Sequence, residues 1–219
     1  MSQQLVVVLG DVVDSRDVAD RARFQQTLEA TLQTVNDRFE AAVQTPFQIL
    51  KGIDEVGGVL YSLERVYDVV KYVAREIHPV DIRFAVARGT VDVGLDAGEI
   101  AAMDGPAFHA ADRILDDIEE RDRAFGLEAD DAFVDVLLGN YVNLQFLVAD
   151  AWTDKELEVI TLYERLGTQE AVADRLDVTQ QRVSSVIQDT NWNVVNGIET
   201  DLQELFATYS RLLEDDAAV

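Results

Sequence analysis

The spacing of apolar residues changes along the first half of the chain, and each spacing predicts a different element. Residues 5–9 are all apolar and mostly β-branched, which predicts a buried strand. From Asp20 to about Val43 apolar side chains recur every three or four positions, which predicts an amphipathic helix that Pro46 ends. Residues 47–51 and 56–61 are strand-like, and residues 52–55 between them predict a hairpin turn.

The next ninety residues continue this alternation. We expect a helix at 63–77, a strand at 82–91, a glycine-rich loop, a helix at 106–120, a short strand at 123–127 and a helix from Asp130 toward Ala151. The resulting order is β-α-β-β-α-β-α-β. It predicts an α+β fold of the ferredoxin-like split type, with extra elements at its end.

After Trp152 the pattern becomes wholly helical. Thr153 or Asp154 is expected to cap a helix at 154–166 that ends at Gly167, and Thr168 to cap a second helix at 169–176. Thr179 is expected to cap a third helix, and a last helix is expected at 197–213. We therefore predict two domains, an α+β domain at 1–150 and an all-helical domain at 151–219.

The stretch from Thr168 to Ser184 has the spacing of a helix-turn-helix. It places the small Ala173 where two helices cross and Val178 in the core of the turn, as in transcription regulators. The outward side chains suit base edges, because Gln pairs with adenine, Arg with guanine and Ser with either. The predicted DNA-binding residues are Thr168, Gln169, Thr179, Gln180, Gln181, Arg182, Ser184, Ser185 and Gln188. The alternative is a plain helical bundle with a solvated polar face.

Charge is the strongest compositional signal. The chain has 42 acidic and 18 basic residues, a net charge of −24, spread along a normally hydrophobic sequence. This distribution indicates a protein of a salt-accumulating archaeon or bacterium, because molar salt screens such repulsion. The segment from residue 151 onward is itself acidic, so its attraction to DNA phosphates should be weak.

Residue usage restricts the chemistry. Cysteine is absent and only His78 and His109 are present, so disulfides, thiol catalysis and metal sites built on cysteine or histidine are excluded. A metal would be held by carboxylates, which favours a hard cation such as Mg²⁺. No window approaches eighteen consecutive apolar residues and Met1 to Gln4 does not begin a signal peptide, so we expect a cytoplasmic protein without a membrane span.

Two carboxylates are candidates for a metal site. Asp11 directly follows the first predicted strand and Asp54 lies in the hairpin, and in this fold the two places are spatial neighbours. Such a pair can hold Mg²⁺ against a triphosphate. The alternative for each residue is a simple capping role.

Four motifs, in order, resemble the SatD family. They are residues 10–16 (Gly-Asp-Val-Val-Asp-Ser-Arg), 54–58 (Asp-Glu-Val-Gly-Gly), 83–89 (Arg-Phe-Ala-Val-Ala-Arg-Gly) and 104–111 (Asp-Gly-Pro-Ala-Phe-His-Ala-Ala). That family is similar to the class III nucleotide cyclase catalytic domain, and its members often add a C-terminal helix-turn-helix. The resemblance implies metal binding by Asp11 and Asp54. Candidate nucleotide-binding residues are Ser15, Arg16, Glu55 and His109. The alternatives are a surface ion pair for Arg16 and, favoured for His109, a role in capping or packing its helix.

The chain also departs from the cyclase pattern. Asp14 stands where cyclases place a glycine against phosphate. The cyclase Asn-x-Ala-Ala-Arg helix motif reads Phe108-His109-Ala110-Ala111-Asp112 here, so both transition-state residues are missing in register. Loss of one such stabiliser costs on the order of a hundred- to a thousandfold in rate.

The favoured hypothesis is therefore a DNA-binding transcription regulator whose degenerate cyclase-like head forms a homodimer and senses a nucleotide. A Mg²⁺-dependent nucleotidyl cyclase, or a related nucleotide-processing enzyme, is the alternative. A third hypothesis is an interaction module with neither activity.

Overall fold

Five strands form one sheet in the order β2-β3-β1-β4-β5. The computed structural model describes residues 4–95 and 98–217, so Met1 to Gln3 lie outside it. Neighbouring strands are antiparallel except β4 and β5, which are parallel. The first four strands have the order expected of the split βαββαβ arrangement, and the predicted α+β class is confirmed. The strands are β1 (Gln4–Val12), β2 (Val43–Lys51), β3 (Glu55–Leu60), β4 (Ile82–Thr90) and β5 (Phe125–Glu128).

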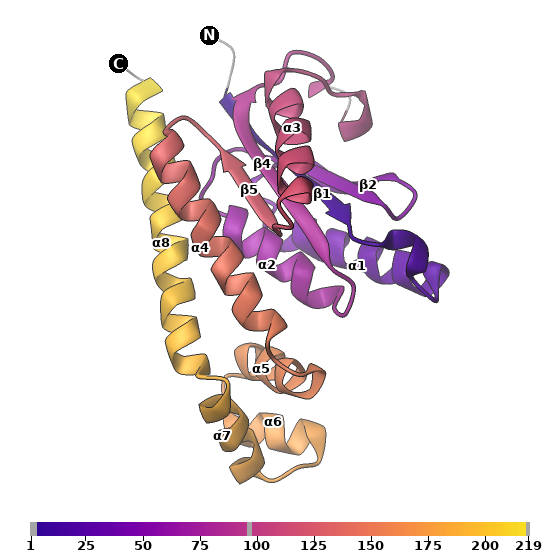
Figure 1. Ribbon diagram of the computed structural model, residues 1–219, viewed down its shortest axis with the longest axis vertical. Helices are drawn as coiled ribbons and strands as arrows, with labels where there is room; N and C mark the ends of the chain where they lie inside the picture. Colours follow the sequence, from indigo (N-terminus) through magenta and orange to yellow (C-terminus); the bar gives the residue numbers. More distant parts are fainter. Residues whose placement is uncertain (1–3, 96–97, 218–219) are drawn as a thin grey trace. The chain divides into compact units, whose positions relative to one another are not determined.

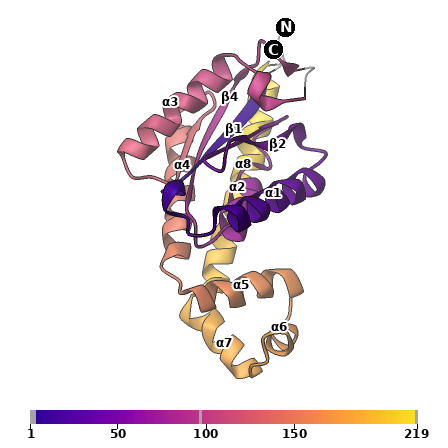
Figure 2. The same cartoon turned by 90° about the vertical axis from the view of Figure 1, so that its right-hand side faces the viewer.

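Helices cover both faces of this sheet (Figures 1 and 2). Helices α1 (Arg21–Arg38) and α2 (Val66–Glu76) lie on one face, and α3 (Pro106–Glu120) lies on the other. The buried residues of α1 repeat at helical spacing, as predicted; they are Phe24, Leu28, Thr31, Leu32 and Val35. A single apolar core joins α3 to the sheet strands.

The first helix is shorter than the sequence predicts. It ends at Arg38, and Phe39 closes it with a backbone bond to the carbonyl of Val35. Pro46 is not its stop signal, because this residue lies inside β2. Strand β2 is at the sheet edge and its register is irregular near Thr45, a setting in which a residue without an N–H donor is tolerated.

The chain divides into two compact units, residues 1–143 with 203–219, and residues 144–202. Two long helices, α4 (Ala132–Asp150) and α8 (Trp192–Ala217), each contribute to both units. The sequence-based division into 1–150 and 151–219 differs from these units at two places. Residues 144–150 belong to the second unit, and the C-terminal half of the last helix packs with the sheet. Phe206, Tyr209 and Leu213 of this half are buried, and Phe206 meets Phe125 edge-on.

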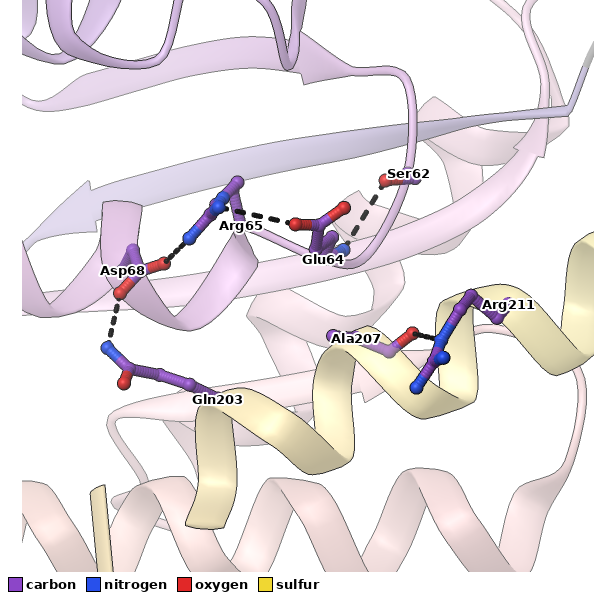
Figure 3. Close-up of polar contacts among 7 residues, drawn as sticks. All are labelled: Ser62, Glu64, Arg65, Asp68, Gln203, Ala207 and Arg211. Atoms are coloured by element: carbon purple, nitrogen blue, oxygen red, sulfur yellow. Dashed lines mark hydrogen bonds and ion pairs between the residues drawn. The ribbon is translucent and has the colours of Figure 1, made fainter. Parts of the chain in front are cut away.

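Polar contacts reinforce the packing of α8 within the first unit. Ser210 Oγ accepts a hydrogen bond from the backbone N–H of Leu63. Figure 3 shows Gln203 of α8 donating to the Asp68 carboxylate of α2, whose second oxygen accepts from Arg65. These bonds anchor the end of the chain against the start of α2.

The second unit contains three short helices, α5 (Asp154–Leu166), α6 (Gln169–Leu176) and α7 (Gln180–Asp189). Their predicted caps at Thr153, Thr168 and Thr179 are confirmed, and Gly167 ends α5 in a left-handed conformation. Buried apolar residues of all three helices form one core. Val178 does not join this core, since it is 41% exposed.

Among the described residues, helix α4 is the one helix that passes a length-and-composition test for a membrane span, a test that core helices of soluble proteins also pass. Its 19 residues are long and apolar enough to cross a membrane, by length and composition alone. The absence of an unbroken apolar run did not reveal this, because single polar residues interrupt it. Two of these, Asp135 and Asn143, make hydrogen bonds within the first unit.

Candidate functional site

The candidate metal site lies where β1 meets the β2–β3 hairpin. Asp11 is inside β1 rather than after it, opposite Glu55 of β3 and Arg83 of β4. The next residue, Val12, donates its N–H to the backbone carbonyl of Asp54 at 2.7 Å. The structure therefore brings the end of β1 next to the hairpin residue Asp54, whose charge acts on Asp11.

The hairpin holds Asp54 by its backbone. Its N–H donates to the carbonyl of Lys51, and Gly52 adopts the positive φ of 59° that this turn requires. Its side chain as a whole is 41% exposed, yet its Oδ1 atom is buried and has no hydrogen-bond partner among the described residues. A buried carboxylate oxygen without a donor is costly, and a cation would satisfy it.

Negative charge concentrates around Asp11. Burial raises the pKa of Asp11 above its usual range, and the nearby carboxylates of Glu119 and Glu55 raise it further. Asp54 acts in the same direction, whereas Arg83 opposes them. Burial and the surrounding carboxylates therefore both disfavour the ionised form of Asp11.

Arg21 is a member of this site that the sequence reasoning missed. Its Nη1 donates to the carbonyl of Ser15 at 2.7 Å, and its Nη2 lies 3.8 Å from Asp54 Oδ1. Asp20 caps the helix by accepting from the N–H of Arg23, which fixes the first turn of α1 beside the loop. The one sequence feature that could have indicated this role is the position of Arg21 directly after the helix cap Asp20.

The loop between β1 and α1 contains two of the predicted nucleotide contacts. Ser15 to Asp17 form the short 3-10 helix η1, preceded by Asp14 in the left-handed region with φ 47°. Ser15 is buried and its carbonyl is held by Arg21, whereas Arg16 is exposed. Asp14 thus adopts a backbone conformation that glycine takes more readily, at the position where cyclases have glycine.

Glu55 and His109 have different relations to this site. Glu55 adjoins Asp54 and pairs with Lys51 at 3.9 Å. His109, a candidate nucleotide contact, does not lie beside the carboxylates, and its position agrees with the alternative role in its own helix. It is near the start of α3, where Ala107 packs against Gly89, a β4 residue paired with Leu5. Leu5 is six strand residues from Asp11, about 20 Å away.

His109 has its own local partner. Its Nε2 lies 3.3 Å from Asp104, and its side chain is mostly exposed. Arg113, one turn further along α3, pairs with Glu128. Only the far end of α3, near Glu119, approaches Asp11.

The donor set fits Mg²⁺ held jointly with a phosphate ligand. Across residues 4–95 and 98–217 no group of three or more His, Asp or Glu side chains has metal-binding geometry. Mg²⁺ is commonly bound by one or two carboxylates, with water and substrate phosphates completing its shell. Asp11 and Asp54 would be the two protein ligands.

The second unit has a separate polar surface on α7. Buried Val183, Val186 and Ile187 form the inner side of this helix. Of the predicted DNA-binding residues, Thr168, Thr179, Gln180, Gln181, Arg182 and Gln188 are exposed, and Gln169, Ser184 and Ser185 are half-buried. The two threonine hydroxyls also accept from the N–H groups of Ala171 and Arg182 as helix caps.

Solved structures resembling this chain include nucleotide cyclases. A bacterial light-regulated adenylyl cyclase is 12% identical, with a TM-score of 0.40, covering 58% of this chain and 76% of its own. The guanylyl cyclase domain of a fusion protein from the aquatic fungus Blastocladiella emersonii is 17% identical, with a TM-score of 0.39, covering 52% and 73%. A regulator of polyketide synthase expression from Bifidobacterium adolescentis is 9% identical, with a TM-score of 0.25, covering 97% and 86%.

Comparison with curated proteins gave no match. The model of the SatD family matches residues 5–194, which includes the sheet with its helices and the three short helices. The chain belongs to the SatD family.

Proposed function

We propose that this chain is a cytoplasmic transcription regulator that reads double-stranded DNA with α7 and senses a nucleotide with its sheet unit. The observation that supports it best is the exposed face of α7. Gln180, Gln181 and Arg182 are exposed in its first turn, whereas the next residue, Val183, is buried. Amide and guanidinium groups in the first turn of a recognition helix are suited to reach base edges.

The local backbone supports a helix-turn-helix reading. Asp177 ends α6 in the left-handed region with φ 53°, and the N–H of Val178 donates to the carbonyl of Ala173. Thr179 then caps α7 directly, so the turn is short and fixed. Ala173 is buried, as a close crossing of two helices requires.

The negative charge of this region limits how much attraction to DNA phosphates can contribute to binding. Residues 151–219 hold 14 acidic and 5 basic residues, and Arg182 is the one basic residue of α7. Phosphate attraction would therefore contribute little, and the salt dependence of binding should be shallow. Affinity would depend on base contacts and on pairing two copies at two half-sites.

The sheet unit would bind a nucleoside triphosphate with Mg²⁺ at Asp11 and Asp54. The buried Oδ1 of Asp54 and the carboxylates gathered around Asp11 support a cation there. Glu55 is opposite Asp11, Ser15 is linked to Asp54 through Arg21, and Arg16 is exposed in the same loop. His109 would contact a ligand only from another copy or at a second place. Ligand binding would shift the population of DNA-competent states.

The second candidate is a Mg²⁺-dependent nucleotidyl cyclase or related nucleotide-processing enzyme. The buried Oδ1 of Asp54, which has no hydrogen-bond donor among the described residues, favours this enzymatic function because Mg²⁺ could bind there. Bound Mg²⁺ would stabilise the attacking and leaving oxygens of a phosphoryl transfer. Incubation with each nucleoside triphosphate and Mg²⁺ or Mn²⁺ tests it, and turnover lost in both Asp11→Ala and Asp54→Ala would establish it.

Gel retardation tests the DNA proposal. The purified chain in molar potassium chloride is mixed with its own promoter and with genomic fragments, and we expect a discrete shifted band. The variant Gln180→Ala/Gln181→Ala/Arg182→Ala should lose this band. The matched control Gln25→Ala/Gln26→Ala/Arg23→Ala changes the same residue types on the exposed face of α1 and should keep it. No retardation of any fragment would refute the proposal.

A further inference from the structure

Helix α4 exposes an unusual amount of apolar surface. Phe133 is 72% exposed and Leu147 is 65% exposed. The large apolar side chains on this outer face, named here the α4 stripe, are Phe133, Val136, Leu137, Leu144, Leu147 and Val148. Six such side chains amount to several hundred Å² of apolar surface, near the upper end of about 300–600 Å² for the largest patch on a monomer.

The opposite side of α4 is held by specific bonds, so its orientation is well determined within the first unit. Asp135 accepts from the N–H of Ala129 and from the Tyr209 hydroxyl. Asn143 accepts from the N–H groups of Ala124 and Phe125, at the start of β5. The α4 stripe therefore faces outward because the polar residues of the helix bind inward.

The α4 stripe has the residue spacing of a coiled-coil interface. Phe133, Leu137, Asn140, Leu144 and Leu147 follow one another at alternating intervals of four and three residues. This is the repeat by which two helices interlock side chains. A single polar position such as Asn140 favours one register over others.

We propose that the α4 stripe of one copy pairs with the α4 stripe of a second copy of this chain. The pairing supplies the dimer contact that the proposed function needs, and so extends that proposal. Two stripes together would bury about the 1,000 Å² that a specific interface requires.

Charge favours a second copy over other occupants. The net charge of −24 makes most surfaces of two copies repel each other. In α4 the only charged residues are Asp135, which is buried, and Asp150 at its end. This face is therefore one on which two copies can meet without opposing carboxylates. A lipid surface is disfavoured because α4 offers no Lys or Arg to anionic headgroups.

A single-cysteine variant tests the pairing directly, because the chain has no cysteine of its own. Asn140 is exposed at the centre of the stripe, so parallel or antiparallel pairing places it opposite its own copy. Asn140→Cys should form a covalent dimer on mild oxidation, visible on a non-reducing gel. Gln25→Cys, exposed on α1, is the matched control and should stay largely monomeric. Equal, low cross-linking of both variants would overturn the proposal.

Sedimentation in molar potassium chloride provides the second readout. Wild type should sediment as a dimer, and Leu137→Glu/Leu144→Glu should weaken dimerisation at least tenfold while keeping the wild-type circular dichroism. Val93→Glu, a change at an exposed valine outside α4, should remain dimeric. A monomeric wild type, or a double variant that stays dimeric, would contradict the inference. Neither assay contains DNA, so a dimer that fails to retard DNA would refute only the proposed function.

Discussion

Arg21 lies 3.8 Å from Asp54, measured from Nη2 to Oδ1, while its other terminal nitrogen holds the carbonyl of Ser15. One guanidinium thus links the loop after β1 to the hairpin after β2. It also provides positive charge next to a buried oxygen that lacks a hydrogen-bond donor within the described chain. Arg21 and a metal ion would therefore compete for Asp54.

Removing this guanidinium should change cation and nucleotide binding in opposite directions. Without Arg21, Asp54 loses its nearest positive charge, so Arg21→Ala should bind Mn²⁺ alone several-fold more tightly. The same variant releases the Ser15 carbonyl and should bind a Mg²⁺–nucleoside triphosphate more weakly. Titration calorimetry measures both. Arg23→Ala, exposed on the same helix, is the control and should match wild type. Unchanged Mn²⁺ affinity in Arg21→Ala would exclude a metal at Asp54.

Ionisation of Asp11 should lower the free energy of unfolding of the protein. Burial and neighbouring carboxylates raise its pKa above 3.8, so the folded state holds this proton more tightly than the unfolded chain. Stability is therefore lost as pH rises from 3.8 through the folded pKa. Asp11→Asn should raise Tm by a few degrees near neutral pH, and the gain should shrink as pH falls toward 3.8.

A control separates this effect from the general relief of negative charge. Asp174→Asn removes an exposed carboxylate on α6 and should change Tm less than Asp11→Asn. Mg²⁺ with nucleotide should raise the Tm of wild type and leave that of Asp11→Asn unchanged. A lower Tm in Asp11→Asn at neutral pH would show that the carboxylate stabilises the fold instead.

Tyr209 should be a stabilising contact of α8. Its hydroxyl accepts from the N–H of Asp131 and donates to the buried carboxylate of Asp135. Tyr209→Phe leaves the N–H of Asp131 without this acceptor and removes one of the donors to Asp135, so it should cost about 1–3 kcal/mol in the free energy of unfolding. Urea unfolding measures this, with Tyr61→Phe at an exposed position as the control. Equal stability of the two variants would refute the role.

The same tyrosine predicts a pH dependence. Burial first, and the charge of Asp135 next, raise the pKa of Tyr209 to about 12 from 10.0. Because the folded pKa is the higher one, its contribution is complete below pH 10.0 and is lost as pH rises toward about 12. Wild type should lose stability faster than Tyr209→Phe in that interval, and parallel curves would contradict the raised pKa.

Local signals in the sequence were sufficient for most elements and for the carboxylate pair. Threonine caps at Thr153, Thr168 and Thr179 each began a helix because a side-chain oxygen satisfies the first N–H groups. Asp11 and Asp54 were brought together because the hairpin and β1 are neighbours in the predicted sheet. Both inferences need only nearby residues and strand order.

Long-range packing explains the features that the sequence did not predict correctly. His109 is in the first turn of α3, which runs parallel to β1. This helix begins beside Gly89, the partner of Leu5, and only its end near Glu119 approaches Asp11. Pro46 is tolerated because β2 is an edge strand, a property of the assembled sheet. The apolar side of α4 faces outward because Asp135 and Asn143 bond inward, and periodicity cannot tell which side of a helix is buried.

The central claim is that α7 reads a DNA sequence, and sequencing the genomic fragments captured by the chain in molar potassium chloride tests it most directly. We predict that wild type enriches fragments sharing one motif with two half-sites. Gln181→Ala/Arg182→Ala should lose that enrichment, while Gln26→Ala/Arg23→Ala should retain it. Fragments without a common motif, or the same motif enriched by the α7 variant, would contradict the account.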